Sequence, residues 1–204
     1  MKAKDLALMV LPAILWPISF IVLRSIFIYA LLVSVFILAV LSIYFHRKNI
    51  LWKKAKRSAW IAVAAGVVGA VLLYLVFYFG NTVVSALGAG GLVGNVYAMI
   101  YGDVAKTKLI VLLALIGLFE EIYWRGALQG YIRKNSKTFK NYPWVVTTAY
   151  YTLVHISALN PILVVAALFV GLVTSVLAER YGILSSIAAH IVWIELIVVF
   201  LPVL

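Results

Sequence analysis

Six ionisable residues lie inside long apolar stretches of this sequence. They are Glu120, Glu121, Arg125, His155, His190 and Glu195. A charge at the centre of a bilayer costs at least about 2.5 to 3.5 kcal/mol, so each of these residues needs a partner, water or a function. A carboxylate and an imidazole beside one water molecule can serve as general base and proton carrier. These residue types therefore indicate hydrolysis, with Glu120, His155 and His190 as the candidate catalytic residues.

The three candidates lie at a similar depth along three different apolar segments. Counted from segment ends at about residues 131, 142 and 182, Glu120, His155 and His190 are 8 to 13 residues inside. At about 1.5 Å per residue of helix, this corresponds to roughly 12 to 20 Å. The matched depth predicts one shared polar cavity. We expect this cavity to be reached from the side of the membrane on which these three segment ends lie, which is the cytoplasmic side in the orientation derived below.

Glu121 and Arg125 are four residues apart, which favours an ion pair on one side of a helix. Glu120 then points about 100° away from Glu121. Two interpretations stay open for these three residues. The charges could only neutralise one another to hold helices together, or Glu120, which Arg125 is less well placed to reach, could be free for chemistry.

The composition predicts an integral membrane protein. Apolar residues make up 66% of the 204 residues, charged residues only 11%, and the mean hydropathy is +1.15. Globular proteins average about a quarter charged residues, so a water-soluble fold of this size could not cover its surface. Several apolar stretches also reach the roughly 18 to 20 residues that a helix needs to cross the hydrocarbon layer.

The formal net charge of +11 raises the possibility of a nucleic-acid partner, but the positions of the charges argue against it. Most basic residues form two short loops between apolar segments, Arg47, Lys48, Lys53, Lys54, Lys56 and Arg57 in one and Arg133, Lys134, Lys137 and Lys140 in the other. Such loops set membrane topology and lie beside anionic lipid headgroups. We therefore expect membrane lipid, and no nucleic acid, as a partner.

The apolar stretches predict an all-α bundle of about seven transmembrane helices in a single integral membrane domain, residues 1–204. N-terminal helices occupy residues 1–80, and a catalytic core occupies residues 105–203. The helices are expected at 6–22, 26–45, 59–79, 107–131, 144–158, 161–177 and 183–203. Residues 81–107 lack a clean apolar run and are expected to form a partly helical, interfacial or re-entrant connection.

The distribution of lysine and arginine predicts the orientation. Loops on the N-terminal side of the membrane carry thirteen of these residues, and the opposite side carries three, namely Arg24, Lys106 and Lys108. Positive charge concentrates in cytoplasmic loops, so the N-terminus is expected in the cytoplasm and the C-terminus outside. The expected location is the cell membrane, with an uncleaved first helix and an active site that opens toward the cytoplasm.

Three motifs follow one another on the late helices. Glu120-Glu121-Ile-Tyr-Trp-Arg125 has the form EExxxR, Tyr151-Thr-Leu-Val-His155 has the form aromatic-xxx-His, and His190 comes shortly after a basic-Tyr-Gly turn. In this order the motifs resemble the CPBP family of intramembrane proteases. That family includes type II CAAX prenyl endopeptidases and bacteriocin-processing or immunity relatives. The resemblance covers about residues 105–203.

The resemblance implies hydrolysis of a peptide bond in a membrane-associated substrate, with prenylated CAAX tails as one substrate class. It implies that Glu120 and His155 activate water and that His190 helps to stabilise the oxyanion. Glu121 and Arg125 are implied to shape the site.

The sequence departs from the family pattern at two positions. Tyr151 stands where the family usually has Phe, and we treat it as a supporting residue. Ile194 stands four residues after His190, where the family carries Asn, and isoleucine cannot donate a hydrogen bond to an oxyanion.

Other functions stay open alongside the protease. The first is a catalytically degenerate family member that acts as a membrane immunity or partner-binding protein, which Ile194 favours. The second is a transporter or proton relay, which buried Glu and His also mark, although no internal repeat is found. One Glu and two His could also bind zinc, but HExxH is absent and the chain has no cysteine, so a glutamate-type protease with no metal and no other cofactor is favoured.

Overall fold

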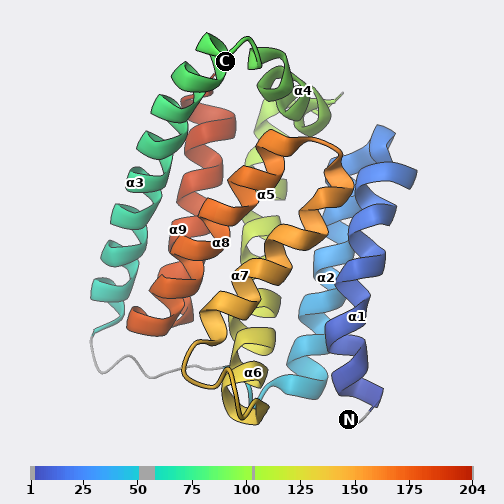
Figure 1. The fold of residues 1–204 in the computed structure, drawn as a ribbon, viewed down its shortest axis with the longest axis vertical. Coiled ribbons are helices and arrows are strands. Elements are labelled where there is room, and N and C mark those ends of the chain that lie inside the picture. Colours follow the sequence, from blue (N-terminus) through green and yellow to red (C-terminus); the bar gives the residue numbers. More distant parts are fainter. Residues whose placement is uncertain (1–2, 51–57, 103, 204) are drawn as a thin grey trace.

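The chain folds into a bundle of helices (Figure 1). The computed structural model describes residues 3–50, 58–102 and 104–203. Within these ranges no strand is present, which confirms the predicted all-α class. Part of the first basic loop and one N-terminal lysine lie outside the described residues, namely Lys53, Lys54, Lys56, Arg57 and Lys2.

The N-terminal part is a helical hairpin. Helix α1 (Ala3–Pro17) continues into a π-helical turn at Ile18–Val22, and a short 3-10 turn at Arg24–Ile26 leads into α2 (Phe27–His46). The predicted break between the first two helices is therefore confirmed. Its shortness forces the two helices to run antiparallel.

The middle of the chain is more helical than predicted. Helix α3 (Ala59–Ala86) extends beyond its expected end, and the expected connection contains α4 (Gly90–Tyr101). Helix α5 (Lys106–Glu121) then continues without interruption through a π-helical segment, Ile122–Leu128, into α6 (Gln129–Asn135). The first motif lies across the change from α-helix to π-helix.

The C-terminal part holds three helices, of which α7 (Pro143–Val154) is short and ends in a 3-10 turn, His155–Ala158. Helix α8 (Pro161–Tyr181) begins at a side-chain cap, because the Asn160 side chain accepts hydrogen bonds from the Ile162 and Leu163 amides at 3.0 and 3.2 Å. Gly182 ends α8 with a φ of +93°, and this turn reverses the chain into α9 (Ile183–Glu195), which ends in a π-helical turn, Leu196–Phe200.

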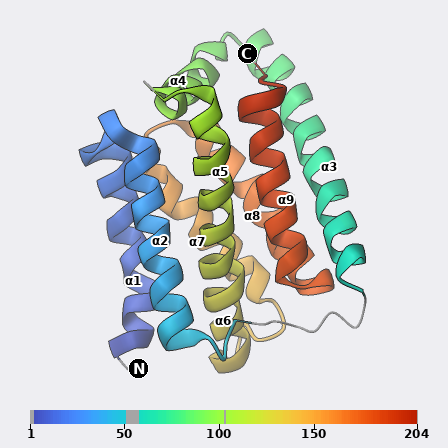
Figure 2. The ribbon, with the colours of Figure 1, turned by 180° about the vertical axis from the view of Figure 1, so that it is seen from behind.

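Five helices of the described chain are long and apolar enough to cross a membrane. They are Ala3–Val22, Arg24–His46, Ala59–Ala86, Pro161–Tyr181 and Ile183–Phe200. The other two predicted spans coincide with α5 and α7. Helix α7 has only 12 residues, and the run from α5 to α6 carries the charged first motif. Both lie within the same bundle (Figure 2).

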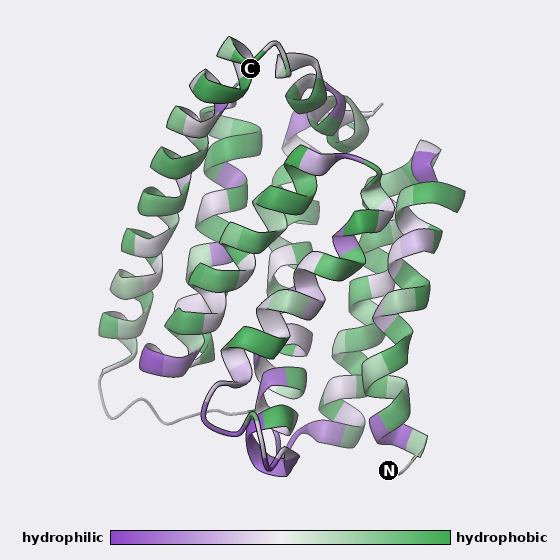
Figure 3. Ribbon diagram, viewed as in Figure 1, coloured by the Kyte–Doolittle hydropathy of each residue, from purple (hydrophilic) through white to green (hydrophobic). Residues whose placement is uncertain are grey.

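The two ends of the bundle differ in composition. The N-terminus, α6 and the segment between α6 and α7 lie at one end, whereas α4 and the C-terminus lie at the other (Figures 1 and 2). Hydrophilic residues gather toward the ends, most densely around α6, and the middle is mostly hydrophobic (Figure 3). This distribution is that of an integral membrane protein whose lipid-facing belt separates two polar ends.

Helices α3 and α9 pack closely because small residues line their contact. A Cβ added to Gly66 would meet the Ser185 carbonyl oxygen and would lie 2.8 Å from the Ala188 Cβ. Ala62 and Gly66, both buried on α3, therefore allow the two helices to pack closely.

Candidate active site

The first motif forms a buried ion pair. Arg125 donates from Nη1 to Glu121 Oε1 at 2.9 Å, and both side chains are fully buried. Arg125 also donates to the Gly171 carbonyl at 3.2 Å and to Ser175 Oγ at 3.3 Å, both on α8. The predicted pairing of Glu121 with Arg125 is thus observed, and it fastens the π-helical segment to α8.

Helix α9 brings His190 onto both carboxylates of the motif. The ring nitrogen Nδ1 lies 2.8 Å from Glu121 Oε1, and because a carboxylate can only accept, Nδ1–H is the donor. The other ring nitrogen, Nε2, lies 3.8 Å from Glu120 Oε2. Glu121 therefore orients the imidazole, and Nε2 is directed at Glu120.

Tyr151 on α7 connects Glu120 to His155. Its hydroxyl donates to Glu120 Oε2 at 2.9 Å, and its backbone carbonyl lies 2.7 Å from His155 Nδ1. Glu120 and His155 are both described residues, and no direct hydrogen bond joins them. The structure thus brings Glu120, His190 and Tyr151 into contact, with His155 one residue further along the network.

His155 lies against an aromatic wall that sequence reasoning missed. The Trp16 indole N–H points at His155 Nε2 at 3.4 Å, so Nε2 accepts and Nδ1–H donates to the Tyr151 carbonyl. The rings of Trp16 and Phe20 lie 5.9 and 5.8 Å from the imidazole, centre to centre. No local spacing in the sequence connects α1 with α7, so no signal pointed to Trp16.

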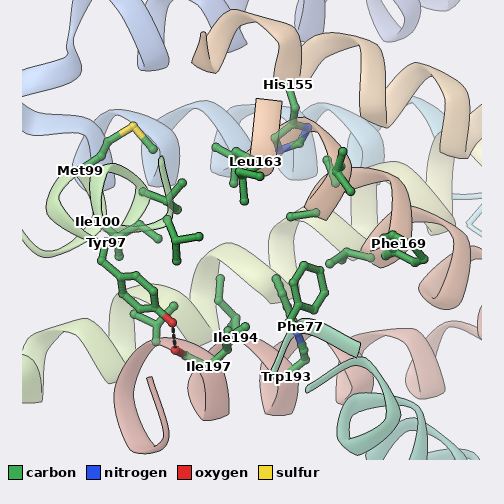
Figure 4. A pocket seen from close by; sticks show the side chains of 18 of the residues that line it. Phe77, Tyr97, Met99, Ile100, His155, Leu163, Phe169, Trp193, Ile194 and Ile197 are labelled. Carbon is green, nitrogen blue, oxygen red and sulfur yellow. Dashed lines mark hydrogen bonds between the residues drawn. The ribbon is translucent and has the colours of Figure 1, made fainter. Parts of the chain in front are cut away.

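A mainly apolar cavity of about 340 Å³ adjoins these groups. Its polar floor includes Glu120, Tyr151, His155 and His190, and its walls come from α2, α3, α4, α8 and α9. Figure 4 shows His155 on one wall and Ile194 and Trp193 on the facing wall. The predicted matched depth of the three candidate residues is therefore explained by a shared cavity.

The cavity extends from Glu120 toward the end of the bundle that holds α4. Tyr97, Met99 and Ile100 of α4 line it (Figure 4). Tyr97 also donates to the Ile197 carbonyl at 2.7 Å, which ties α4 to the π-helical turn after α9. The cavity thus points away from the N-terminus and α6.

Glu195 and Tyr150 lie apart from this cluster. Glu195 is 8% exposed, does not line the cavity, and neither of its carboxylate oxygens has a hydrogen-bond partner among the described residues. Tyr150 donates its hydroxyl to the Met9 carbonyl on α1, which occupies it away from Glu120. Trp193, by contrast, lines the cavity, and its indole N–H is buried and unpaired within the described chain.

Among the described residues, Glu120, His155 and His190 are not grouped as ligands around one point. Catalytic zinc needs three protein ligands at about 2.0 to 2.2 Å from one point. Within the described ranges, no group of three His, Cys, Asp or Glu side chains is arranged to hold a metal ion. Both ring nitrogens of His155 already have hydrogen-bond partners in this arrangement. Nε2 accepts from the Trp16 indole N–H, and Nδ1–H donates to the Tyr151 carbonyl.

Membrane-length helices around a buried cluster of two carboxylates and two imidazoles define an integral membrane protein with ionisable side chains inside the bundle. Residues 104–194, which hold all three motifs, match the family model of type II CAAX prenyl endopeptidase Rce1-like proteins. The family predicted from the motifs is confirmed, and it supports a protease. Comparisons with curated proteins and with solved structures found no match.

Proposed function

We propose that this chain is an intramembrane endopeptidase that hydrolyses a peptide bond of a membrane-associated substrate. The observation that carries the proposal is Glu120, a carboxylate only 3% exposed, on the floor of an apolar cavity beside His190 and Tyr151. Apolar walls suit a lipidated or hydrophobic segment, and the polar floor suits a peptide bond. A prenylated CAAX-type tail combines both features.

In the proposed reaction Glu120 is the general base. It takes a proton from a water molecule in the cavity while the water oxygen attacks the scissile carbonyl carbon. The proton then passes to the leaving amine as the carbon–nitrogen bond breaks. General-base catalysis of this kind contributes about 10²- to 10⁴-fold to a rate.

We assign His155 to water activation and His190 to the oxyanion. The geometry supports this role for a protonated His190, because Nδ1–H donates to Glu121 and the protonated ring presents Nε2–H toward Glu120 and the cavity. His155 reaches water only when the 3.4 Å contact between Trp16 and its Nε2 opens. Substrate binding against Phe20, which lines the cavity, is a simple way to open it.

Tyr151 and Trp193 are the side chains that can replace the donor missing at Ile194. The Tyr151 hydroxyl already points at Glu120, and the Trp193 indole N–H is buried and unpaired beside the cavity. A donor aimed at a developing oxyanion is worth about 2.7 to 4 kcal/mol. Either side chain would therefore offset much of the loss.

We propose that substrate reaches Glu120 through the cavity from the α4 end. The orientation expected from the charges puts that end outside the cell, whereas the expected opening of the site is cytoplasmic. If substrate enters through this cavity, the orientation predicted from the charges and the predicted cytoplasmic opening cannot both be correct. The side on which α4 lies therefore decides from which face of the cell membrane the substrate comes.

Ile194 also favours a second function, a degenerate family member that binds a membrane partner without cleaving it. Its apolar side chain lines the cavity where a donor is usual in the family. Such a protein would bind a lipidated peptide equally well whether Glu120 is present or is replaced by another residue. Cleavage thus separates the two functions, and binding alone does not.

The test uses purified protein in lipid bilayers with a panel of membrane-embedded peptides, prenylated and unprenylated, each assayed with and without a metal chelator. A glutamate-type protease cleaves at least one peptide, keeps this activity in chelator, and loses it in His190→Ala with the fold intact. Zinc-restored cleavage after chelation would contradict the metal-independent mechanism. Binding of peptides without any cleavage would favour the degenerate protein.

A further inference from the structure

A second pocket of about 470 Å³ lies at the opposite end of the bundle from α4, remote from the candidate active site. It is built from the first turn of α1, the end of α2 and the residues after it, and α6. Four cationic side chains line it, Lys4, Arg47, Lys48 and Lys134, against one carboxylate, Asp5. Its charge is therefore clearly positive.

The cations of this basic pocket are available to a ligand. The ion pairs in the described chain involve Arg125, Arg133 and His190, and none involves Lys4, Arg47, Lys48 or Lys134. Arg133, next to Lys134, is instead paired with Glu179 of α8. Glu179 therefore has its own cation, and among the described residues that line the pocket four cations face one carboxylate, Asp5.

His46 holds the three walls of the pocket together. It is only 4% exposed, Asn49 Nδ2 donates to its Nδ1 at 3.3 Å, and its Nε2–H therefore donates to the Lys4 carbonyl at 3.2 Å. Its ring also meets the Tyr131 ring edge-on, with centres 6.0 Å apart. One buried side chain thereby links α1, α2 and α6, so the pocket has a fixed floor.

Two aromatic side chains extend the pocket toward lipid. Tyr44 and Phe45, in the last turn of α2, line the pocket and are 77% and 44% exposed. Because α2 is of membrane-spanning length, exposed aromatic residues at its end lie at the bilayer interface. A ligand here has a polar anionic part among the cations and an apolar part beside Tyr44 and Phe45.

We infer that this basic pocket binds the phosphate-bearing headgroup of an anionic membrane lipid. Phosphate oxygens match the lysine and arginine donors, and Asn49 and Asn135 offer amides to headgroup hydroxyls. The acyl chains lie along the exposed aromatic side of α2. A free phosphate ion could also bind the lysine and arginine side chains. It has no acyl chain to lie along the aromatic side of α2.

The experiment measures lipid binding by native mass spectrometry of the full chain, so its result does not depend on proteolytic activity. Wild type is compared with Lys48→Gln/Lys134→Gln and with the control Lys137→Gln/Lys140→Gln, which removes two exposed charges near the same end without altering the pocket. Phosphatidylglycerol and phosphatidylcholine serve as probes, with inorganic phosphate as competitor.

We expect wild type and the control pair to retain phosphatidylglycerol in preference to phosphatidylcholine. The double variant Lys48→Gln/Lys134→Gln should lose roughly 10- to 30-fold in affinity for phosphatidylglycerol, since each basic residue near a membrane surface is worth about 1 kcal/mol. Equal losses in both pairs, no preference between the lipids, or displacement by inorganic phosphate at millimolar concentration would each overturn the inference. Unchanged thermal unfolding of both pairs confirms that the fold is intact.

Discussion

The Tyr151 hydroxyl donates to Glu120 Oε2 at 2.9 Å, a contact that a phenylalanine at this position could not make. Across the cavity, Ile194 presents an apolar side chain where a hydrogen-bond donor is expected in this family. The two departures from the family pattern thus face the same cavity. One adds a donor and the other removes one, and we propose that Tyr151 compensates for Ile194.

Compensation predicts that the effect of losing the hydroxyl depends on residue 194. Tyr151→Phe should lower the cleavage rate by at least about tenfold in the natural chain, because a charge-assisted hydrogen bond is worth roughly 1.5 to 3 kcal/mol. In an Ile194→Asn background the same change should cost much less. Rates of the four proteins of this double-mutant cycle give the measurement, and strictly additive effects would rule out the compensation.

Breaking the buried ion pair should strongly destabilise the protein. Arg125→Met leaves the Glu121 carboxylate buried without its cation, a change that costs about 3 to 5 kcal/mol. Thermal unfolding in detergent should therefore show a large loss, partly recovered in Glu121→Gln/Arg125→Met.

The control for the ion pair is Arg133→Gln, which breaks the more exposed pair with Glu179. Its expected cost is below about 1 kcal/mol. Equal losses in Arg125→Met and Arg133→Gln would contradict a special role for the buried pair.

The sequence predicted the fold class and the grouping of the candidate residues because both depend on local signals. Apolar runs identify helices, and Glu120, His155 and His190 at one depth indicate a shared cavity. The spacing of Glu121 and Arg125 predicted their ion pair correctly. These inferences need only helix geometry and the cost of burying charge.

What the sequence did not predict depends on contacts between distant segments. Trp16 reaches His155 across 139 positions, and Arg125 bonds to Ser175 at a separation of 50. Helix α4 was also only partly anticipated, because its run of small and polar residues lacks the periodicity of a buried helix. Tertiary packing, which a single sequence does not encode locally, decides each of these features.

Close packing of α3 against α9 predicts a sharp difference between two glycines of the same helix. Gly66→Ala forces a methyl group onto the Ser185 carbonyl and should destabilise the protein by about 1 to 3 kcal/mol. Gly80→Ala meets no atom within 4 Å and should be neutral or slightly stabilising. Similar unfolding midpoints for the two variants would show that the helices do not pack as described.

The absence of cysteine allows a direct test of orientation. Lys137→Cys and Lys108→Cys place single thiols on exposed positions at opposite ends of the bundle. With the basic end in the cytoplasm, a membrane-impermeant thiol reagent added to intact cells should label Lys108→Cys and spare Lys137→Cys. The reverse pattern would place α4 and the mouth of the cavity in the cytoplasm.

The central claim is that Glu120 is the catalytic base, and the most direct test is the cleavage rate of Glu120→Gln relative to Glu195→Gln. Both replacements neutralise a buried glutamate, at 3% and 8% exposure, but only Glu120 lines the cavity. With a cleavable peptide in lipid, Glu120→Gln should lose about 10²- to 10⁴-fold in rate with unchanged substrate binding, and Glu195→Gln should keep its rate. Near-normal cleavage by folded Glu120→Gln would contradict the proposed mechanism.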